Sequence, residues 1–562
     1  MARSRIRRGA LALAPIVGWV LGAAFVQPAA AATKIGTGVP IDSSACIDRD
    51  DRPISMPKVR DPNLAENLYR EGIMDQLSQI FDIPDKILWA LQPVGVTANQ
   101  RAVNINRYDE VPASSWFTPR NHVRALKPEE VRNGPAGPVH PEPPYTITST
   151  KKGGVTPGFQ VKDAADHKWI VKLDPKGYPQ LGSGAAVVSS RLIWAAGYNF
   201  SQDEAFSFTR DELKIDDELL KGKDGEAPFT EEYLDAMLRE GATANGRYYA
   251  AASLFLKGKP AGPLSFSNRR DDDPNDWYHH KNRRELRGLY VVYSWVNNWD
   301  VKDQQSLDMF HEDEGSKEGH LVHSLLDASG SLGAAGEGPK QLPTGYEERI
   351  DLGWTMKRIL TLGFIVEPWR KVKQESGMPS VGNFDAEGFK PKGWKGYQVI
   401  PPWREMTRAD AYWGAKVVAS FTDAQIRAAI DAAGYEDPAA KDYLFRILAE
   451  RRNRIARTWF KEVTPLDFFV VERNSLRFRD LAVDVGVAKP REYEVVTGKD
   501  KEGVVHAVRL TSPELPLDEG PLARVHNPLT LEIRAQGVDA KPVRVTLAHR
   551  GADWAVVEVR HE

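Results

Sequence analysis

Apolar residues recur along this chain with two different spacings. Two apolar runs, 159–161 and 169–173, flank a polar turn, and this pattern predicts a β-hairpin. Residues 184–196 carry apolar side chains at helical spacing and are closed by Gly197, so a helix is predicted there. Further strands are expected at 206–208 and 248–256, on either side of a charged insertion at 210–240.

The helical spacing dominates the second half of the chain. Residues 282–296 predict a helix, a second begins at Thr407, and Thr422 with Gln425 forms a capping box for a third. A longer helix is predicted at 438–460. The last hundred residues return to short alternating runs separated by Gly, Pro and Asp, which is typical of a small β-sandwich. Its strands are expected at 492–496, 504–510, 529–535, 543–548 and 554–559.

The N-terminal part predicts an export signal. Four arginines precede an apolar run and a group of alanines, a pattern typical of a signal peptide over residues 1–32. No later segment approaches the roughly 20 apolar residues of a membrane helix, so the mature chain is expected to have no transmembrane segment. It is expected to be periplasmic or extracellular. Residues 33–145 form an N-terminal extension, with a helix expected at 61–81 and a proline-rich, extended connector at 127–144.

Composition narrows the class of protein. With 562 residues the chain is long enough for several domains. Its formal net charge is -2, so no basic footprint for nucleic acid is present and that class of partner is excluded. Cys46 is the one cysteine, so no intrachain disulfide and no cysteine-built metal site can form.

One short region carries candidate chemistry. Asp300 is followed by Lys302 and then by Gln305, and an apolar run further on leads into Asp327. Phosphoryl transfer needs an aspartate to orient the acceptor, a lysine for growing phosphate charge, and oxygen ligands for a metal ion. Lys172, at the end of a predicted strand, would add a second cation.

This order of elements and residues resembles the protein-kinase-like fold, and most closely its atypical or secreted members. The resemblance implies an α+β, two-lobed domain that uses Mg or Mn with ATP. Lys172 takes the place of the strand lysine that holds nucleotide phosphates, and Gly153, Gly154 and Gly158 lie on the phosphate-covering loop. Asp300 and Lys302 would be catalytic, and Gln305 and Asp327 would bind the metal. The implied divisions are an N-lobe with an insertion at 146–281, a helical C-lobe at 282–462 and a C-terminal β domain at 463–562.

Departures from the family pattern keep two functions open. The helix 184–196 has no acidic residue to pair with Lys172, Gln305 replaces an asparagine, and Ala328-Ser329 follows Asp327. The first hypothesis is a divergent phosphotransferase or nucleotide-binding protein, acting on a protein or a cell-envelope component. The alternative is a non-catalytic binding or scaffold protein of the cell envelope with a vestigial kinase-like fold. Without a helix acid, Lys172 is expected to form an ion pair with Asp327.

Two other groups of acidic residues could carry chemistry. Asp271, Asp272, Asp273 and Asp276, with His279 and His280, could gather a metal ion, although a solvated acidic loop is the commoner use of such a run. Glu347 and Glu348, with Asp385 and Glu387, could supply a carboxylate pair for glycoside hydrolysis, but the sequence does not fix their separation.

Overall fold

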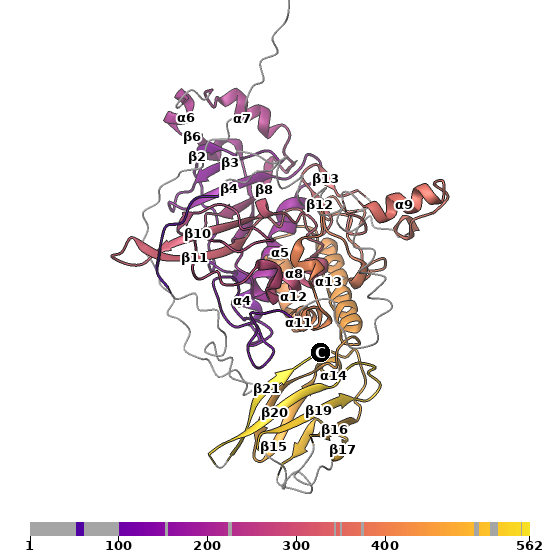
Figure 1. Cartoon of the computed structure of the whole chain (residues 1–562). Helices are drawn as coiled ribbons and strands as arrows, with labels where there is room; N and C mark the ends of the chain where they lie inside the picture. The colour runs from indigo at the N-terminus through magenta and orange to yellow at the C-terminus, as the bar shows by residue number, and fades with distance from the viewer. Residues whose placement is uncertain are drawn as a thin grey trace, which may run out of the picture.

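The chain adopts a mixed α+β fold (Figure 1). The computed structural model describes residues 52–60, 101–151, 156–222, 227–341, 344–348, 351–371, 376–498, 505–517, 527–551 and 553–562. The predicted signal peptide, the helix expected at 61–81, and Gly153 and Gly154 lie outside these residues. Within the described part of the chain, no helix is both long and apolar enough to cross a bilayer.

A seven-stranded sheet follows the N-terminal extension. Its strands lie in the order β5-β8-β4-β3-β2-β6, with β7 paired to β8. The predicted hairpin is confirmed, because β3 and β4 pair in antiparallel register with Gly158 opposite Lys172. Burial alternates along β4, so Trp169 and Val171 enter the core while Lys172 lies on the other face. The strands are β2 (Tyr145–Thr150), β3 (Gly158–Lys162), β4 (Lys168–Leu173), β5 (Asp203–Phe208), β6 (Leu213–Ile215), β7 (Thr243–Ala244) and β8 (Arg247–Leu254).

Helix α5 (Leu181–Ala196) packs against β5 and β8. It begins three residues before the predicted start, because the buried Asp174 carboxylate accepts hydrogen bonds from the backbone N–H groups of Gln180 and Ser183. Gly197 ends it with φ of 124°, and a β-carbon there would lie 2.2 Å from the Phe117 ring. The helix is therefore fixed at both ends.

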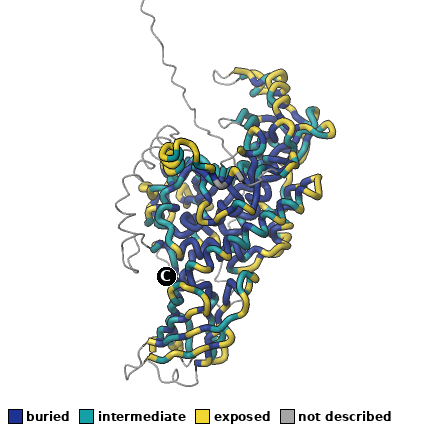
Figure 2. The backbone as a smooth tube through the Cα atoms, turned by 90° about the vertical axis from the view of Figure 1, so that its right-hand side faces the viewer, coloured by how far each residue is buried: buried dark blue, intermediate teal, exposed yellow. Residues whose placement is uncertain are grey.

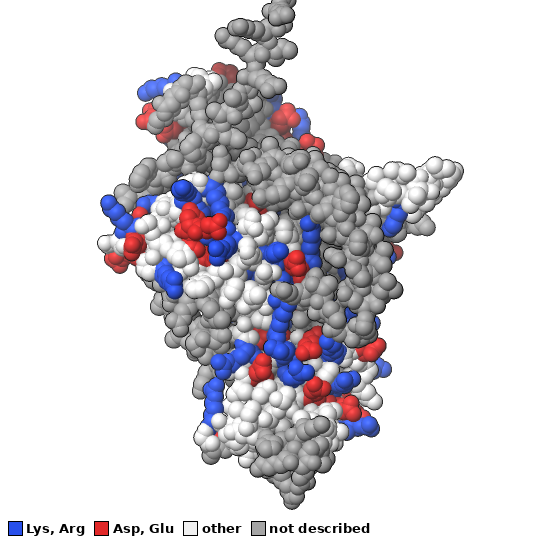
Figure 3. All heavy atoms as spheres, viewed as in Figure 1, with Lys and Arg blue, Asp and Glu red and all other residues white. Residues whose placement is uncertain are grey.

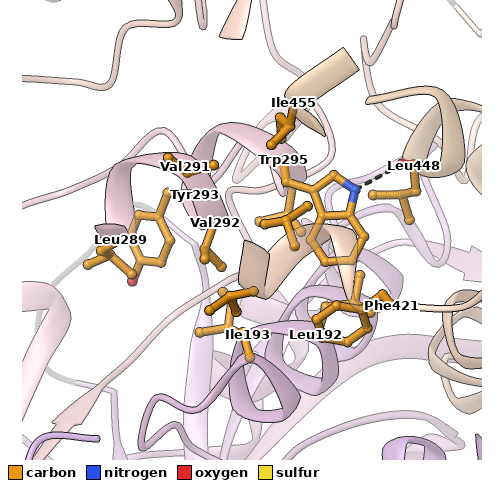
Figure 4. Packing of buried hydrophobic residues seen from close by; sticks show 14 of the residues in the cluster. Leu192, Ile193, Leu289, Val291, Val292, Tyr293, Trp295, Phe421, Leu448 and Ile455 are labelled. Atoms are coloured by element: carbon orange, nitrogen blue, oxygen red, sulfur yellow. Dashed lines mark hydrogen bonds between the residues drawn. The ribbon is translucent and has the colours of Figure 1, made fainter. Parts of the chain in front are cut away.

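Five further helices build the larger core, on the side of α5 away from the seven-stranded sheet. Trp295 of α8 packs near Leu192 and Phe421, and its indole nitrogen donates to the backbone oxygen of Leu448, 2.8 Å away (Figure 4). Figure 2 shows that buried residues concentrate in this body. The helices are α8 (Arg284–Val296), α10 (Pro401–Arg404), α11 (Arg408–Ala419), α12 (Asp423–Ala432) and α13 (Pro438–Trp459). The predicted capping boxes at Thr407 and Thr422 are both present.

A second sheet lies beside the helical body. Its order is β1-β11-β10-β9, and β10 pairs with β11 in antiparallel register from Ser306 opposite Leu325 to Glu312 opposite Gly319. The elements of this region are β1 (Ile54–Ser55), β9 (Lys259–Pro260), the 3₁₀ turns η4 (His280–Asn282) and η5 (Asp303–Gln305), β10 (Ser306–Glu312), β11 (Glu318–Leu325), β12 (Ala334–Ala335) and β13 (Gly338–Pro339).

Two antiparallel sheets follow α13 and share one buried core, drawn in yellow in Figure 1. The order of the larger sheet is β17-β16-β19-β20-β21, and that of the smaller is β14-β15-β18. Alternate residues of both, such as Phe469, Ile533 and Val545, point into the shared core. The elements are β14 (Leu466–Glu472), β15 (Ser475–Asp480), α14 (Leu481–Asp484), β16 (Tyr493–Thr497), β17 (Ala507–Leu510), β18 (Glu514–Pro516), β19 (Leu529–Ala535), β20 (Val543–Arg550) and β21 (Asp553–Arg560).

The prediction of an extended connector at 127–144 is wrong in part. Pro128 occupies the first turn of α4 (Pro128–Asn133), where its missing N–H costs nothing, and Glu130 caps the backbone N–H of Lys127. The charged insertion also has structure. It holds η3 (Arg210–Glu212), β6, α6 (Asp217–Lys221) and α7 (Glu231–Leu238); elsewhere lie α9 (Leu352–Leu360), η6 (Pro368–Lys371) and η7 (Pro391–Gly393).

Candidate functional site

The β10–β11 hairpin brings two distant loops together. Because Ser306 lies opposite Leu325, the residues just outside the hairpin also meet, and the backbone N–H of Leu326 donates to the carbonyl of Gln305 at 2.9 Å. The loop from Asp300 to Gln305 precedes β10, and Asp327 follows β11. The register of one hairpin therefore places these predicted site residues at the same open end.

Lys172 and Asp327 meet at this end. Lys172 Nζ lies 2.8 Å from Asp327 Oδ2, so the ion pair expected from the sequence is present. The side chains are 15% and 27% exposed, which leaves the pair accessible to a ligand. Burial alone would raise the pKa of Asp327, but the charge and hydrogen bond of Lys172 and the Ser329 hydroxyl outweigh it and hold the pKa well below its ordinary value. Asp327 is therefore a carboxylate held in its charged form.

Asp300 is held by its own loop. Lys302 Nζ lies 2.9 Å from both carboxylate oxygens of Asp300, and Gln305 Nε2 donates to Oδ2 at 2.8 Å. Asp300 and Lys302 are each 29% exposed. The three residues predicted as a group thus contact one another, and with its nitrogen engaged Gln305 has only its amide oxygen to offer a metal ion.

Lys340 joins the site and was not predicted. It follows β13, and its ammonium group donates to the carbonyl of Gly330 at 2.6 Å and lies 4.8 Å from the centre of the Trp299 ring. Burial lowers the pKa of Lys340 to about 8, although Asp300 and Asp327 act in the opposite direction. Both carboxylates are close enough to act on it, so Lys340 links the two loops. No periodic pattern in the sequence signals this residue, which follows a Gly-Pro pair.

Asp203 is a second unpredicted member. Burial raises the pKa of this β5 residue to about 6, against the hydroxyl of Ser253 and the charge of Lys172. Ser253 donates to Oδ1 at 2.6 Å, whereas Oδ2 has no hydrogen-bond partner among the described residues. The kinase-like pattern places an acid near Lys172 on the helix 184–196, which has none; Asp203, on strand β5, is close enough for the charge of Lys172 to act on it.

Helix α5 contributes serine rather than an acid. The hydroxyls of Ser189 and Ser331 lie 2.6 Å apart, and Ser331 Oγ is also within hydrogen-bond distance of the Ala185 carbonyl. These contacts connect α5 to the loop after Asp327. Helix α5 therefore positions that loop, but it offers no acidic side chain to Lys172.

Gly158 lies in a strand and not in a phosphate-covering loop. It is the first residue of β3, and a β-carbon on it would lie 2.2 Å from the carbonyl oxygen of Val171. Close approach of the neighbouring strand therefore accounts for the glycine. Lys151, across the loop, donates to the Thr156 carbonyl at 2.8 Å, and burial and the nearby charge of Lys172 lower its pKa.

The donor set fits a hard divalent cation. Asp300, Gln305 and Asp327 offer oxygen atoms, the ligands magnesium and manganese prefer, and magnesium commonly uses one or two carboxylates with phosphate oxygens completing its shell. The described residues contain no cluster of three or more His, Cys, Asp or Glu side chains able to hold a metal by themselves. A cation here would therefore depend on a phosphate ligand.

Several acids of the other two candidate groups are engaged in ion pairs or hydrogen bonds. Asp276 is buried and lies 2.6 Å from His280 and 3.3 Å from Arg283, so this residue is not part of a solvated loop. Glu347 pairs with Arg358, and Asp385 accepts a hydrogen bond from Tyr346. These contacts account for Asp276, Glu347 and Asp385 without a ligand.

Comparisons with known proteins add little. No family model matches the chain, and no curated protein matches it. One similar solved structure is that of CtkA, a proinflammatory kinase of Helicobacter pylori, with 11% sequence identity and a TM-score of 0.30. The match covers 56% of this chain and 96% of that one.

Proposed function

We propose that this chain is an exported, divergent phosphotransferase or nucleotide-binding protein with a two-lobed, kinase-like domain and a C-terminal β-sandwich. The observation that carries the proposal is the accessible ion pair between Lys172 and Asp327, with the Asp300 loop held beside it by the β10–β11 hairpin. Two sheets around one core support the sandwich.

Each residue then has a role that follows from its charge. Lys172 and Lys340 attract the phosphate oxygens of the donor, since both are cations in a poorly solvated site. Asp300 orients the acceptor hydroxyl and accepts its proton, and Lys302 lies beside the growing negative charge. The Asp327 carboxylate, kept charged by Lys172, provides the fixed anion on which a cation is held.

A magnesium or manganese ion would be held by Asp327 and the Gln305 amide oxygen together with donor phosphates. When bound, it neutralises phosphate charge. Lys172 forms the ion pair with Asp327, and it would turn to the donor phosphate when one binds.

A thermal-shift titration with magnesium-ATP tests the proposal. Wild-type protein is expected to gain stability with nucleotide concentration, as binding to the folded state requires. Asp327→Asn removes the charge at constant shape and should lose the shift, whereas Asp313→Asn, an exposed acid in the β10–β11 turn, should keep it. Equal shifts in wild type and Asp327→Asn, or none in either, would remove nucleotide binding at this site.

The second candidate is a non-catalytic envelope-binding or scaffold protein. The specific observation in its favour is that Lys302 and Gln305 engage the carboxylate of Asp300, which reduces its capacity to accept a proton from a substrate. Measurement of ADP release separates the two. Release that depends on Asp300 supports the phosphotransferase, while nucleotide binding without release supports the scaffold.

A further inference from the structure

The segment around α9 projects from the body as a separate finger (Figure 1). The α9 finger comprises residues 351–367. It consists of the helix, a turn through Leu362 and Gly363, both with positive φ, and the irregular segment that leads back to the body. Figure 3 shows it as a lobe that is mostly free of charged side chains. Its shape and surface both set it apart from the rest of the protein.

The base of the finger is firmly attached. Asp351 accepts a hydrogen bond from the backbone N–H of Trp354 and pairs with Lys395. Arg358 joins Glu347 to Glu367 across the finger, with its Nε 2.8 Å from Glu367. Trp369 is buried and packs edge-on to Trp354, with 4.6 Å between the centres of the two rings. The contacts of the base therefore hold the tip away from the body.

The tip is apolar and exposed. Six of the thirteen large hydrophobic side chains that are exposed in the described part of the chain lie on it, whereas the others are scattered. Leu362 is 85% exposed and Phe364 86%. An apolar group of this kind marks an interaction surface. The six are Met356, Ile359, Leu360, Leu362, Phe364 and Val366.

The tip carries positive charge and no acid. Lys357 and Arg358 are the charged residues of 352–366; Arg358 pairs with Glu347 and Glu367 at the base, so Lys357 is the cation of the tip that no acid among the described residues pairs. Lys357 lies 4.4 Å from the centre of the Trp354 ring, and Trp at the boundary of an apolar surface is typical of membrane interfaces. A second copy would bring like charges together at the tip. An anionic lipid surface complements them instead.

The distribution of apolar side chains also favours lipid. Met356, Ile359 and Leu360 share one face of the helix, and Leu362 and Phe364 continue around the turn. A protein groove would cover one face and leave the other exposed, whereas the acyl region of a membrane surrounds an inserted tip. We propose that the α9 finger inserts its tip into the surface of an anionic membrane, to the depth of about 5–10 Å at which interfacial elements lie.

Flotation of the full chain with vesicles tests this proposal. Vesicles of phosphatidylglycerol and phosphatidylcholine should carry the protein upward more strongly than vesicles of phosphatidylcholine alone. Leu362→Ser combined with Phe364→Ser should lower the partition coefficient by about tenfold or more. Tyr233→Ser, which removes an exposed apolar side chain on α7, is the matched control and should bind as wild type does. The apolar N-terminal run is present in every variant, so the difference between variants reports the finger.

Hydrogen exchange gives a readout that does not depend on the variants. Anionic vesicles should slow exchange in peptides that span residues 356–366 and leave the α7 peptides unchanged. The proposal is overturned if the double variant floats as well as wild type, or if these peptides stay unprotected while the protein is bound. It is equally overturned if the protein shows no vesicle binding and instead self-associates in a way that the double variant abolishes.

Discussion

Two lysine–carboxylate clusters in this protein differ in how deeply they are buried. Lys416 of α11 pairs with Glu110 and with Asp467, at 2.7 Å from the latter, and the three side chains are only 4%, 7% and 7% exposed. Trp413 donates to Glu110, which further closes the cluster. Lys172 and Asp327 form an equally short pair that is 15% and 27% exposed. The first cluster joins the N-terminal extension to the C-terminal sheets, and the second is partly exposed to solvent.

The difference teaches that a buried charge pair by itself does not identify a functional site. In the Lys416 cluster the lysine is compensated: burial would lower the pKa of Lys416, but Asp467 and Glu110 outweigh it and hold the pKa above its ordinary value. Buried atoms without a hydrogen-bond partner among the described residues occur beside both clusters, at the ring nitrogens of His122 near Glu110 and at one oxygen of Asp203 near Lys172. The partial exposure of Lys172 and Asp327, and not incomplete pairing, therefore distinguishes the candidate site.

The largest expected effect is on the sealed cluster. Lys416→Met leaves Glu110 and Asp467 buried without their cation, so it should lower the free energy of unfolding by about 3–5 kcal/mol. Chemical denaturation of the full chain measures this. Lys172→Met is the matched control, and because its pair is partly exposed the loss should stay near ~1 kcal/mol or less. Equal losses would mean that the two clusters contribute equally to the free energy of unfolding.

The next effect concerns Asp203, whose folded-state pKa is raised to about 6 by burial. A carboxyl with a raised pKa binds its proton more tightly in the folded state, so its stabilising contribution is present at low pH and is lost as pH rises through about 6. Asp203→Asn should remove that loss and make the variant about 1–3 kcal/mol more stable than wild type near neutral pH. Unfolding free energies measured across acid and neutral pH check it. Parallel curves for the two proteins would show that Asp203 does not titrate in this way.

The sequence was sufficient for elements with an uninterrupted periodic pattern and for residues near their ends. Strand β19 has its predicted bounds, and α13 ends one residue before its predicted end, because both follow uninterrupted periodic patterns. Lys172, Asp300 and Asp327 could be selected as candidates because each lies near the end of such an element. The roles assigned to them stay predictions.

What the sequence could not supply depends on long-range packing. Glu110 and Lys416 are 306 residues apart, and Lys340 reaches the site only because the loop after Asp327 folds back to it. No local spacing encodes either contact. Asp203 was missed because the acid was sought on a helix, and α4 because several prolines indicated extended chain although one of them suits a helix start.

A smaller effect is expected on metal binding at the Lys172 cluster. In Lys172→Met, Asp327 keeps its burial and loses its cation, so its pKa should rise from its present low value. In the presence of ATP, the affinity for Mn²⁺ should then weaken by about tenfold at about pH 5, where the wild-type carboxylate remains charged. Isothermal titration over a range of pH measures the shift. Identical pH profiles for both proteins would mean that Lys172 does not control Asp327, and the site should then be abandoned.

The smallest predicted effect isolates Lys340, which connects the two loops of the open cluster. With a pKa of about 8, this lysine carries its charge at neutral pH and loses it as pH rises through that value. The affinity for magnesium-ATP should therefore fall by about threefold to fivefold above pH 8. Lys340→Arg keeps a cation that does not titrate in this range, so its affinity should stay flat over the same interval even if the arginine fits less well. Binding titrations of both proteins on either side of the transition decide the point. A decline of equal size in the arginine variant would assign the pH dependence to another group, and Lys340 would then be a structural residue like Lys416.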